Sequence, residues 1–226
     1  SDKIILNDLN FTIKPKEKIA VFGKSGSGKS TLMKLLIKFY QPQKGQILID
    51  NININNIDTS YLRDNITYIN QNTLLFDEDI YYNIKYGSKQ SYKLETISPA
   101  PSPTLKPSTN LTPLPSNKVY PKEEIIQDSK IEKILKQYDL LNIYDRLDNK
   151  LRTKAGTRGT NLSLGMQKVT ITMRGILRES KIIIFDEPLA GLDEKTREKI
   201  IKLIINEKKN KTVIIITHDK EILPYM

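Results

Sequence analysis

The architecture of this chain follows from one run of residues, Gly23-Lys24-Ser25-Gly26-Ser27-Gly28-Lys29-Ser30-Thr31. A strand-like segment at 18–22 precedes the run, and apolar residues recur at helical spacing from Leu32 to Phe39 after it. Glycines let consecutive backbone N–H groups curl around a phosphate chain without Cβ clashes, and the following helix adds the positive end of its dipole. A chance match in a chain of this length has odds of roughly one in a hundred. We therefore interpret the run as a phosphate-binding loop rather than as a Gly/Ser-rich surface turn.

The loop also carries the side chains that a bound triphosphate needs. Lys29 can reach the β- and γ-phosphates, and the Ser30 hydroxyl can bind Mg²⁺. We expect the nucleotide-binding residues of the loop to be Gly23, Lys24, Ser25, Gly26, Ser27, Gly28, Lys29, Ser30 and Thr31.

The composition limits the class of protein. The 226 residues are enough for one domain with a sizeable core plus additions. Cysteine is absent, which excludes a disulfide framework and a thiolate metal site and is compatible with an intracellular setting. The net charge of +10 is spread along the chain, so we attribute it to compositional bias rather than to nucleic-acid or membrane binding. The longest apolar runs, such as 213–216, are too short to span a bilayer, so we expect a soluble chain whose membrane role would come from a partner or a removed segment.

Strand-like and helix-like segments alternate along most of the chain. Beyond 18–22, strands are predicted at 4–13 (with a turn at 7–8), 46–50, 66–71, 182–185 and 213–216. Further helices are predicted at 123–138 and 193–206. The last two strands are continuous apolar runs, as strands covered on both faces require. The alternation predicts an α/β fold with a largely parallel core sheet.

The segment from 96 to 121 differs in composition from the rest of the chain. Prolines recur in it amid Ser and Thr, with no glycine and no apolar period. Such a composition cannot bury enough surface to offset the entropy lost on ordering. We predict a disordered or partly polyproline II insertion, and we favour an inert insert over a docking site for a proline-binding partner.

An acidic pair ends the buried strand at 182–185. Asp186 and Glu187 stand at its C-terminal end, where ligands bind in open α/β sheets. One carboxylate there can coordinate Mg²⁺, and a second can orient or activate an attacking water. An isolated Asp-Glu pair would more often cap the next helix. Beside a phosphate-binding loop, the better interpretation is a metal ligand at Asp186 and a water-orienting group at Glu187.

Together these motifs resemble the nucleotide-binding domain of an ATP-binding cassette (ABC) transporter, over nearly the whole chain except the proline-rich insert. Residues 23–30 match the family's Walker A motif and 182–186 its Walker B motif, with Glu187 at the catalytic glutamate. Gln71 falls at the Q-loop glutamine and His218, the only histidine in the sequence, at the switch histidine. Residues 190–193 fall at the D-loop.

Two stretches, 75–87 and 156–159, are similar to the exporter subgroup of that family. In exporters the first of them lies near the surface that faces the transmembrane domain. The resemblance implies ATP and Mg²⁺ as ligands, a transmembrane domain in the same parent chain or a separate subunit, and a position on the cytosolic face of a membrane. It also implies a second cassette in a head-to-tail dimer, which can be a homodimer or a heterodimer, and no nucleic-acid partner.

The signature motif departs from the family's Leu-Ser-Gly-Gly-Gln, since it reads Leu162-Ser163-Leu164-Gly165-Met166. Ser163 and Gly165 are retained, and the resemblance implies that they contact the nucleotide bound by the partner cassette. Leu164 places a side chain where backbone should approach phosphate, so we expect it to hinder that contact. The family's adenine-stacking aromatic lies upstream of this sequence and its last strands follow His218, so we expect a domain cut from a longer chain.

The resemblance also implies an architecture and a set of roles. The fold is expected to be a P-loop NTPase core with a mainly parallel sheet, an antiparallel β subdomain and an α-helical subdomain. Within a single domain, the core and β subdomain are expected at 1–88 and 181–226, and the helical subdomain with the signature loop at 122–180. The implied roles are Mg²⁺ ligands at Ser30, Gln71 and Asp186, catalytic groups at Lys29, Gln71, Glu187 and His218, and partner-nucleotide contacts at Ser163 and Gly165.

Two other functions fit part of the sequence. A soluble ABC-type ATPase that acts on nucleic acid or ribosomes would suit the basic charge, and its binding should weaken steeply with salt. A regulatory cassette that binds ATP but hydrolyses it poorly is a third possibility, and measured turnover would expose it. The stretch 75–87 favours the exporter.

Overall fold

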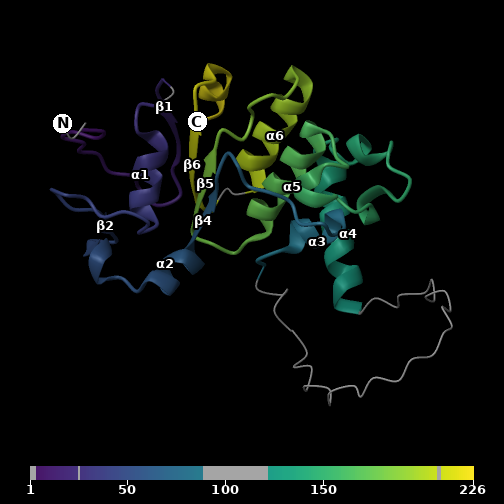
Figure 1. Cartoon of the computed structure of the whole chain (residues 1–226), viewed down its shortest axis with the longest axis horizontal. Helices are drawn as coiled ribbons and strands as arrows, with labels where there is room; N and C mark the ends of the chain where they lie inside the picture. Colours follow the sequence, from purple (N-terminus) through teal and green to yellow (C-terminus); the bar gives the residue numbers. More distant parts are fainter. Residues whose placement is uncertain (1–3, 25, 89–121, 208–209) are drawn as a thin grey trace, which may run out of the picture.

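The computed structural model describes residues 4–24, 26–88, 122–207 and 210–226. Figure 1 shows a central sheet with α1 on one side and α5 and α6 on the other. The proline-rich segment 96–121 and Ser25 of the phosphate-binding loop lie outside the described residues.

The central sheet is parallel, with its strands in the order β1-β6-β5-β4. Its strands are β1 (Lys18–Phe22), β4 (Ile66–Ile69), β5 (Ile182–Asp186) and β6 (Thr212–Thr217). Successive side chains of a strand point to opposite faces, and the two central strands need apolar residues on both faces because helices cover both. Accordingly, Ile183 and Phe185 join the core under α5 and α6, whereas Ile184 joins the core under α1. The predicted parallel α/β sheet is confirmed.

Helices form a layer beyond each face of the sheet. On one side lie α1 (Lys29–Leu36) and α2 (Thr59–Asn65); on the other lie α3 (Ile80–Lys85), α4 (Lys122–Gln137), α5 (Leu164–Leu177) and α6 (Glu194–Glu207). Short 3₁₀ helices occur at η1 (Ile54–Asn56), η3 (Leu141–Tyr144), η4 (Lys150–Arg152), η5 (Thr157–Gly159) and η6 (Lys220–Tyr225). The helices predicted at 123–138 and 193–206 correspond to α4 and α6.

A small antiparallel sheet lies on the same side of the molecule as α1 and α2 (Figure 1). It pairs β2 (Leu48–Ile49) with β3 (Ile52–Asn53), so the strand predicted at 46–50 is present but shorter. The strand predicted at 4–13 is wrong, since these residues are irregular. A strand needs a neighbour to pair its backbone N–H and C=O groups. No strand in the described part of the chain pairs with 4–13, and Asp8 has a φ of 48°, which interrupts an extended run.

Helix α5 runs through the helical layer and is fastened to α3 by one buried arginine. The Arg174 guanidinium donates to the carbonyl of Asn83 at 2.7 Å, to its side-chain Oδ1 at 2.9 Å and to the carbonyl of Leu74 at 3.1 Å. These acceptors lie in the segment that follows Gln71, so α5 sets the position of that segment. α3 therefore packs with the helical layer although it falls within 1–88. None of the helices in the described ranges has the length and apolar character that a bilayer crossing needs.

Candidate nucleotide-binding and catalytic site

The predicted site residues meet at one edge of the sheet. In a parallel sheet the C-terminal ends of all strands lie at the same edge, which is where ligands bind. The phosphate-binding loop follows β1, and Gln71 follows β4. Asp186 is the last residue of β5, Glu187 comes directly after it, and His218 follows β6. The strand order brings together residues that are far apart in the sequence.

The phosphate-binding loop has the backbone that its glycines were expected to supply. Gly26 and Gly28 have φ values of 77° and 90°, a region that other residues rarely adopt. Gly28 stands at the N-terminus of α1 without a side-chain cap, so the first amides of the helix are left for an anion. The Lys29 ammonium folds back over the loop and donates to the carbonyls of Gly23 at 2.6 Å and Lys24 at 3.0 Å.

Asp186 is buried, 6% exposed, and accepts two hydrogen bonds at a single oxygen. Ser30 Oγ donates to its Oδ2 at 2.9 Å, and the Tyr68 hydroxyl donates to the same atom at 2.8 Å. The Ser30 hydroxyl and the Asp186 carboxylate are hard oxygen ligands, side by side, so the residues present fit Mg²⁺ held by few protein groups together with phosphates. Within the described residues no cluster of three or more His, Cys, Asp or Glu side chains is poised to hold a metal.

Sequence reasoning missed Tyr68. Tyr68 lies on β4 opposite Ile184 of β5, and Ile184 is two positions before Asp186 in the sequence. That register between distant strands cannot be read from either segment alone. Burial and the bond to Asp186 raise the pKa of the Tyr68 hydroxyl, which therefore stays protonated and remains a donor.

Glu187 and His218 form the predicted pair. An ionised carboxylate only accepts, so His218 Nδ1–H donates to Glu187 Oε1, at 2.9 Å, and Thr217 Oγ1 donates weakly to Oε2 at 3.4 Å. The glutamate side chain is 12% exposed and the histidine 70%, so the carboxylate is shielded and the ring faces solvent. Glu187 has a φ of 51°, and its amide donates to the carbonyl of Ile216 at 2.9 Å.

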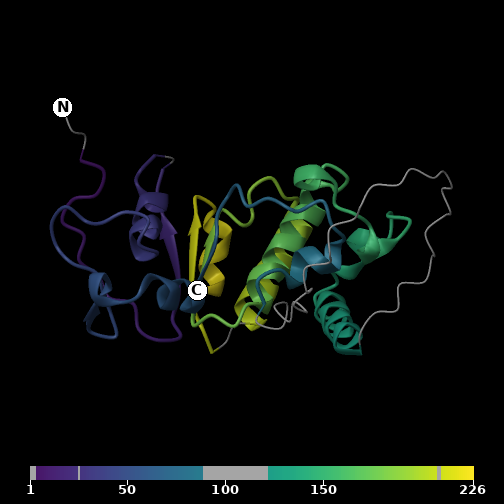
Figure 2. The same cartoon turned by 60° about the horizontal axis from the view of Figure 1, so that its bottom comes forward.

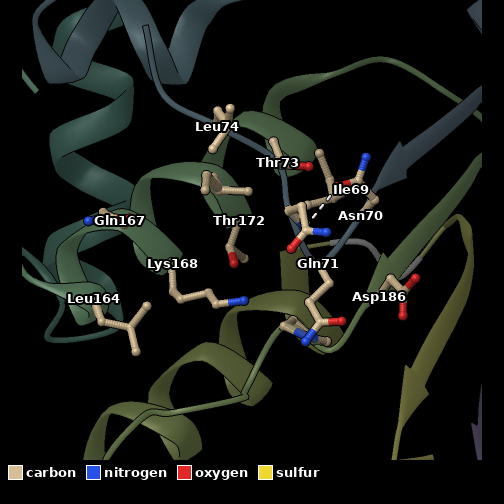
Figure 3. A pocket seen from close by; sticks show the side chains of 13 residues that line it. Ile69, Asn70, Gln71, Thr73, Leu74, Leu164, Gln167, Lys168, Thr172 and Asp186 are labelled. Carbon is tan, nitrogen blue, oxygen red and sulfur yellow. Dashed lines mark hydrogen bonds between the residues drawn. The ribbon is translucent and has the colours of Figure 1, made fainter. Parts of the chain in front are cut away.

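A cavity of about 210 Å³ opens beside Asp186, between the segment after β4 and the start of α5. Gln71, Thr172 and Lys168 line it, and Figure 3 shows these side chains from the two sides of the cavity. Lys168 was also missed. Its Nζ donates to the backbone carbonyl of Glu187 at 3.2 Å, and burial lowers its pKa while the charges of Glu187 and Asp186 oppose that shift.

The signature residues stand apart from the phosphate-binding loop. Ser163 caps α5, where its Oγ accepts from the amide of Met166 at 3.3 Å, and Gly165 lies in the first turn. α5 and α1 cover opposite faces of the sheet (Figure 1), so within one chain Ser163 and Gly165 do not join the site built around Lys29.

The sequence profile described as ABC transporter matches residues 6–190. The chain belongs to the ABC transporter family. This cassette is 38% identical over 219 residues to a Plasmodium falciparum (isolate 3D7) protein named ABC transporter ATM1, a match that covers 96% of the cassette and 18% of that protein. It is 30% identical over 213 residues to an ATP-dependent lipid A-core flippase of Methylobacillus flagellatus, covering 94% of the cassette and 31% of the flippase.

Among solved structures, the cassette is similar to a bacterial Atm1-family ABC exporter with ATP bound. The TM-score is 0.74 at 26% sequence identity, covering 97% of the cassette and 32% of that chain. The cassette therefore spans between 18% and 32% of the length of these proteins. The expected ABC ATPase fold and the exporter-type resemblance are confirmed, and the cassette is an ATPase domain of this family. These relatives do not favour the alternative of a nucleic-acid or ribosome ATPase.

Proposed function

We propose that this cassette hydrolyses Mg·ATP at the C-terminal edge of its central sheet, and that hydrolysis powers export by a membrane domain. The observation that carries the proposal is the bridge from the phosphate-binding loop to the end of β5, where Ser30 donates to Asp186 at 2.9 Å. It joins the loop that would hold the phosphates to the strand end that presents Glu187.

Each residue has a task in this chemistry. Lys29 and the loop amides bind the β- and γ-phosphates, and the phosphate oxygens replace the carbonyls of Gly23 and Lys24 as acceptors for the ammonium. Ser30, Asp186 and Gln71 would hold Mg²⁺, which would supply positive charge against the charge that develops on the phosphate oxygens.

Glu187 and His218 act on the attacking water and the γ-phosphate. Glu187 orients the water and accepts its proton, and the hydrogen bond from His218 fixes the direction of that carboxylate. The exposed ring of His218 is the group best placed to contact a γ-phosphate that arrives from solvent. Both residues sit at strand ends, which keeps them rigid relative to the phosphate-binding loop.

The partners follow from surfaces that one chain leaves open. Ser163 and Gly165 are away from their own nucleotide, so we propose that they contact the nucleotide of a second cassette in a head-to-tail dimer. Around α3, Phe76, Tyr82 and Tyr86 form a partly exposed aromatic cluster, with ring centroids 4.4 Å apart for Phe76 and Tyr86. This cluster lies in the stretch expected to face a transmembrane domain, on the cytosolic side of a membrane.

A thermal-shift experiment tests the nucleotide site. A ligand that binds only the folded state stabilises it, so Mg·ATP should raise the melting temperature of the cassette. Lys29→Ala should remove most of that rise because the phosphates lose their cation. Lys44→Ala, an exposed lysine in a turn, makes the same charge change and should keep the rise. An equal rise in the Lys29 variant would contradict the assignment of the loop.

A further inference from the structure

Two residues on one face of α5 lie against the loop that follows β5. Leu164 and Lys168 are four positions apart, so their side chains share a face of the helix. Both line the cavity beside Asp186, and Figure 3 shows Lys168 extending into it with Leu164 one turn earlier on the same helix. Neither side chain has a task in the chemistry proposed above.

Lys168 holds the backbone of Glu187. Its ammonium donates to the Glu187 carbonyl at 3.2 Å. On the N-terminal side of the same residue, the Glu187 amide donates to the carbonyl of Ile216 at 2.9 Å. Between these two bonds, Glu187 has a φ of 51°, a conformation that a side chain with a Cβ rarely adopts. Such a conformation persists only where its surroundings fix it, and strained residues of this kind cluster at functional sites.

The charge of Lys168 fits the same position. Its half-buried ammonium is attracted by the carboxylates of both Glu187 and Asp186, which offsets part of the cost of burial. An apolar side chain there would remove this donor from the Glu187 carbonyl and the attraction between the ammonium and the two carboxylates.

Leu164 meets the far end of the same loop at Gly191. A Cβ built on Gly191 would lie 2.6 Å from Leu164 Cδ2, far inside contact distance, so the leucine fills the space that a larger residue would need. Gly191 also has a φ of 77°, which glycine tolerates. The leucine that departs from the family's signature is thus matched by a glycine in its own chain.

We propose that Leu164 and Lys168 are positioning residues for Glu187, which hold the loop 187–191 against α5 so that the Glu187 carboxylate keeps its direction. The inference rests on the proposed role of Glu187 as the group that orients the attacking water. The simpler alternative is that both side chains only fill space under the loop. The proposal and this alternative differ in whether a substitution of Leu164 or Lys168 changes ATP turnover by way of Glu187.

The first test replaces Lys168 in the native transporter. Lys168→Met removes the donor and should lower ATP turnover about tenfold while the affinity for Mg·ATP changes less than about twofold. Amide hydrogen exchange in 187–191, measured without nucleotide, should become faster in the same variant. Lys168→Arg should restore slow exchange and most of the turnover. The matched control is Lys199→Met, because Lys199 also donates to a backbone carbonyl, that of Asp139 at 2.8 Å, but away from the site; it should change neither measurement.

The second test repeats Lys168→Met in a Glu187→Gln background, followed by single-turnover kinetics. A positioning residue that acts through Glu187 should cause no further loss there. Equal losses in both backgrounds, or unchanged exchange in 187–191, would overturn the proposal. If Glu187→Gln alone keeps parental turnover, the role of Glu187 is wrong, whereas the exchange result still reports whether Lys168 holds the loop. If Lys168→Met fails to fold, Lys168→Leu, which also lacks a donor, serves in its place.

The third test concerns the contact with Gly191. Gly191→Ala should lower turnover and speed exchange in 187–191, and Leu164→Ala combined with it should recover part of both because the clashing atoms are gone. No recovery in the double variant would mean that only the backbone conformation of Gly191 matters, and the positioning role of Leu164 would be overturned.

Discussion

The edge of the central sheet and the start of α5 hold the residues that we propose act on bound nucleotide, and the two regions are built differently. At the sheet edge, Asp186 is 6% exposed, and hydrogen bonds from Ser30 and Tyr68 fix its carboxylate. At the start of α5, Leu164 is 47% exposed and replaces the family's glycine. The first region keeps the expected residues, whereas the second departs from them.

In the proposed head-to-tail dimer, this difference separates the part of the site that one chain builds from the part that a partner would complete. The sheet edge can assemble within a single cassette because parallel strands deliver its residues to one place. Ser163 and Gly165 do not join the site around Lys29 within one chain, so in the proposed dimer they would contact the nucleotide of a second cassette. A change at Ser163 or Gly165 should therefore act on the partner's site, whereas a change at Lys168, which donates to the Glu187 carbonyl, should act on this chain's own site.

The largest effect is expected at the sheet edge. Glu187→Gln should slow ATP hydrolysis by at least about a hundredfold, because the water loses its orienting carboxylate, while binding of Mg·ATP is kept. In the assembled transporter, ATP turnover measures the loss of hydrolysis, and the affinity for Mg·ATP measures whether binding is kept. Glu194→Gln, an exposed carboxylate at the start of α6, is the matched control. Parental turnover in the Glu187 variant would place the water-orienting group elsewhere.

The next effect tests the link between α5 and the segment that follows β4. Arg174→Leu should lower the free energy of unfolding by about 3 kcal/mol, because buried carbonyl and amide oxygens of Leu74 and Asn83 lose their donors. Urea unfolding of the cassette measures the change, and Arg146→Leu, at an exposed position, should leave it nearly unchanged. Equal stabilities of the two variants would show that α5 is held to α3 by other contacts.

The sequence was informative where chemistry follows from local order. The phosphate-binding loop needs only a strand, its glycines and a helix in succession, and Asp186 needs only the end of an apolar strand. Tyr68 and Lys168 were not predicted as site residues, because their partners are set by strand register and by helix packing, which join segments far apart in the chain. The predicted strand at 4–13 failed for a related reason, since an extended pattern forms a strand only beside another strand.

A smaller effect is expected at Tyr68. Tyr68→Phe keeps the ring but removes one donor to Asp186, so the carboxylate should hold its direction less well. We expect the Mg²⁺ concentration for half-maximal stabilisation by ATP to rise about tenfold, as for other residues that orient a metal ligand. Thermal shifts across a Mg²⁺ titration measure it. Tyr61→Phe, exposed on α2, is the control, and an unchanged titration for Tyr68→Phe would show that Ser30 alone orients the carboxylate.

The smallest effect is expected at Ser163, and it decides between two kinds of dimer. In a homodimer both composite sites contain Leu164 and Met166, so both depend on the altered signature, and Ser163→Ala should reduce turnover about as much as a change at the sheet edge. In a heterodimer, a partner with an unaltered signature completes the site of Lys29 and Glu187, and Ser163 serves only the partner's nucleotide. We propose the heterodimer, with one active and one mainly structural site, so Ser163→Ala should reduce turnover less than about threefold.

The substitution Ser163→Ala also removes the cap of α5, which costs about 1 kcal/mol of stability. Asp58→Ala, which removes the cap of α2 away from the site, separates that loss from any effect on hydrolysis. Comparable losses of turnover from Ser163→Ala and Glu187→Gln would refute the asymmetric dimer and favour a homodimer that tolerates the altered signature.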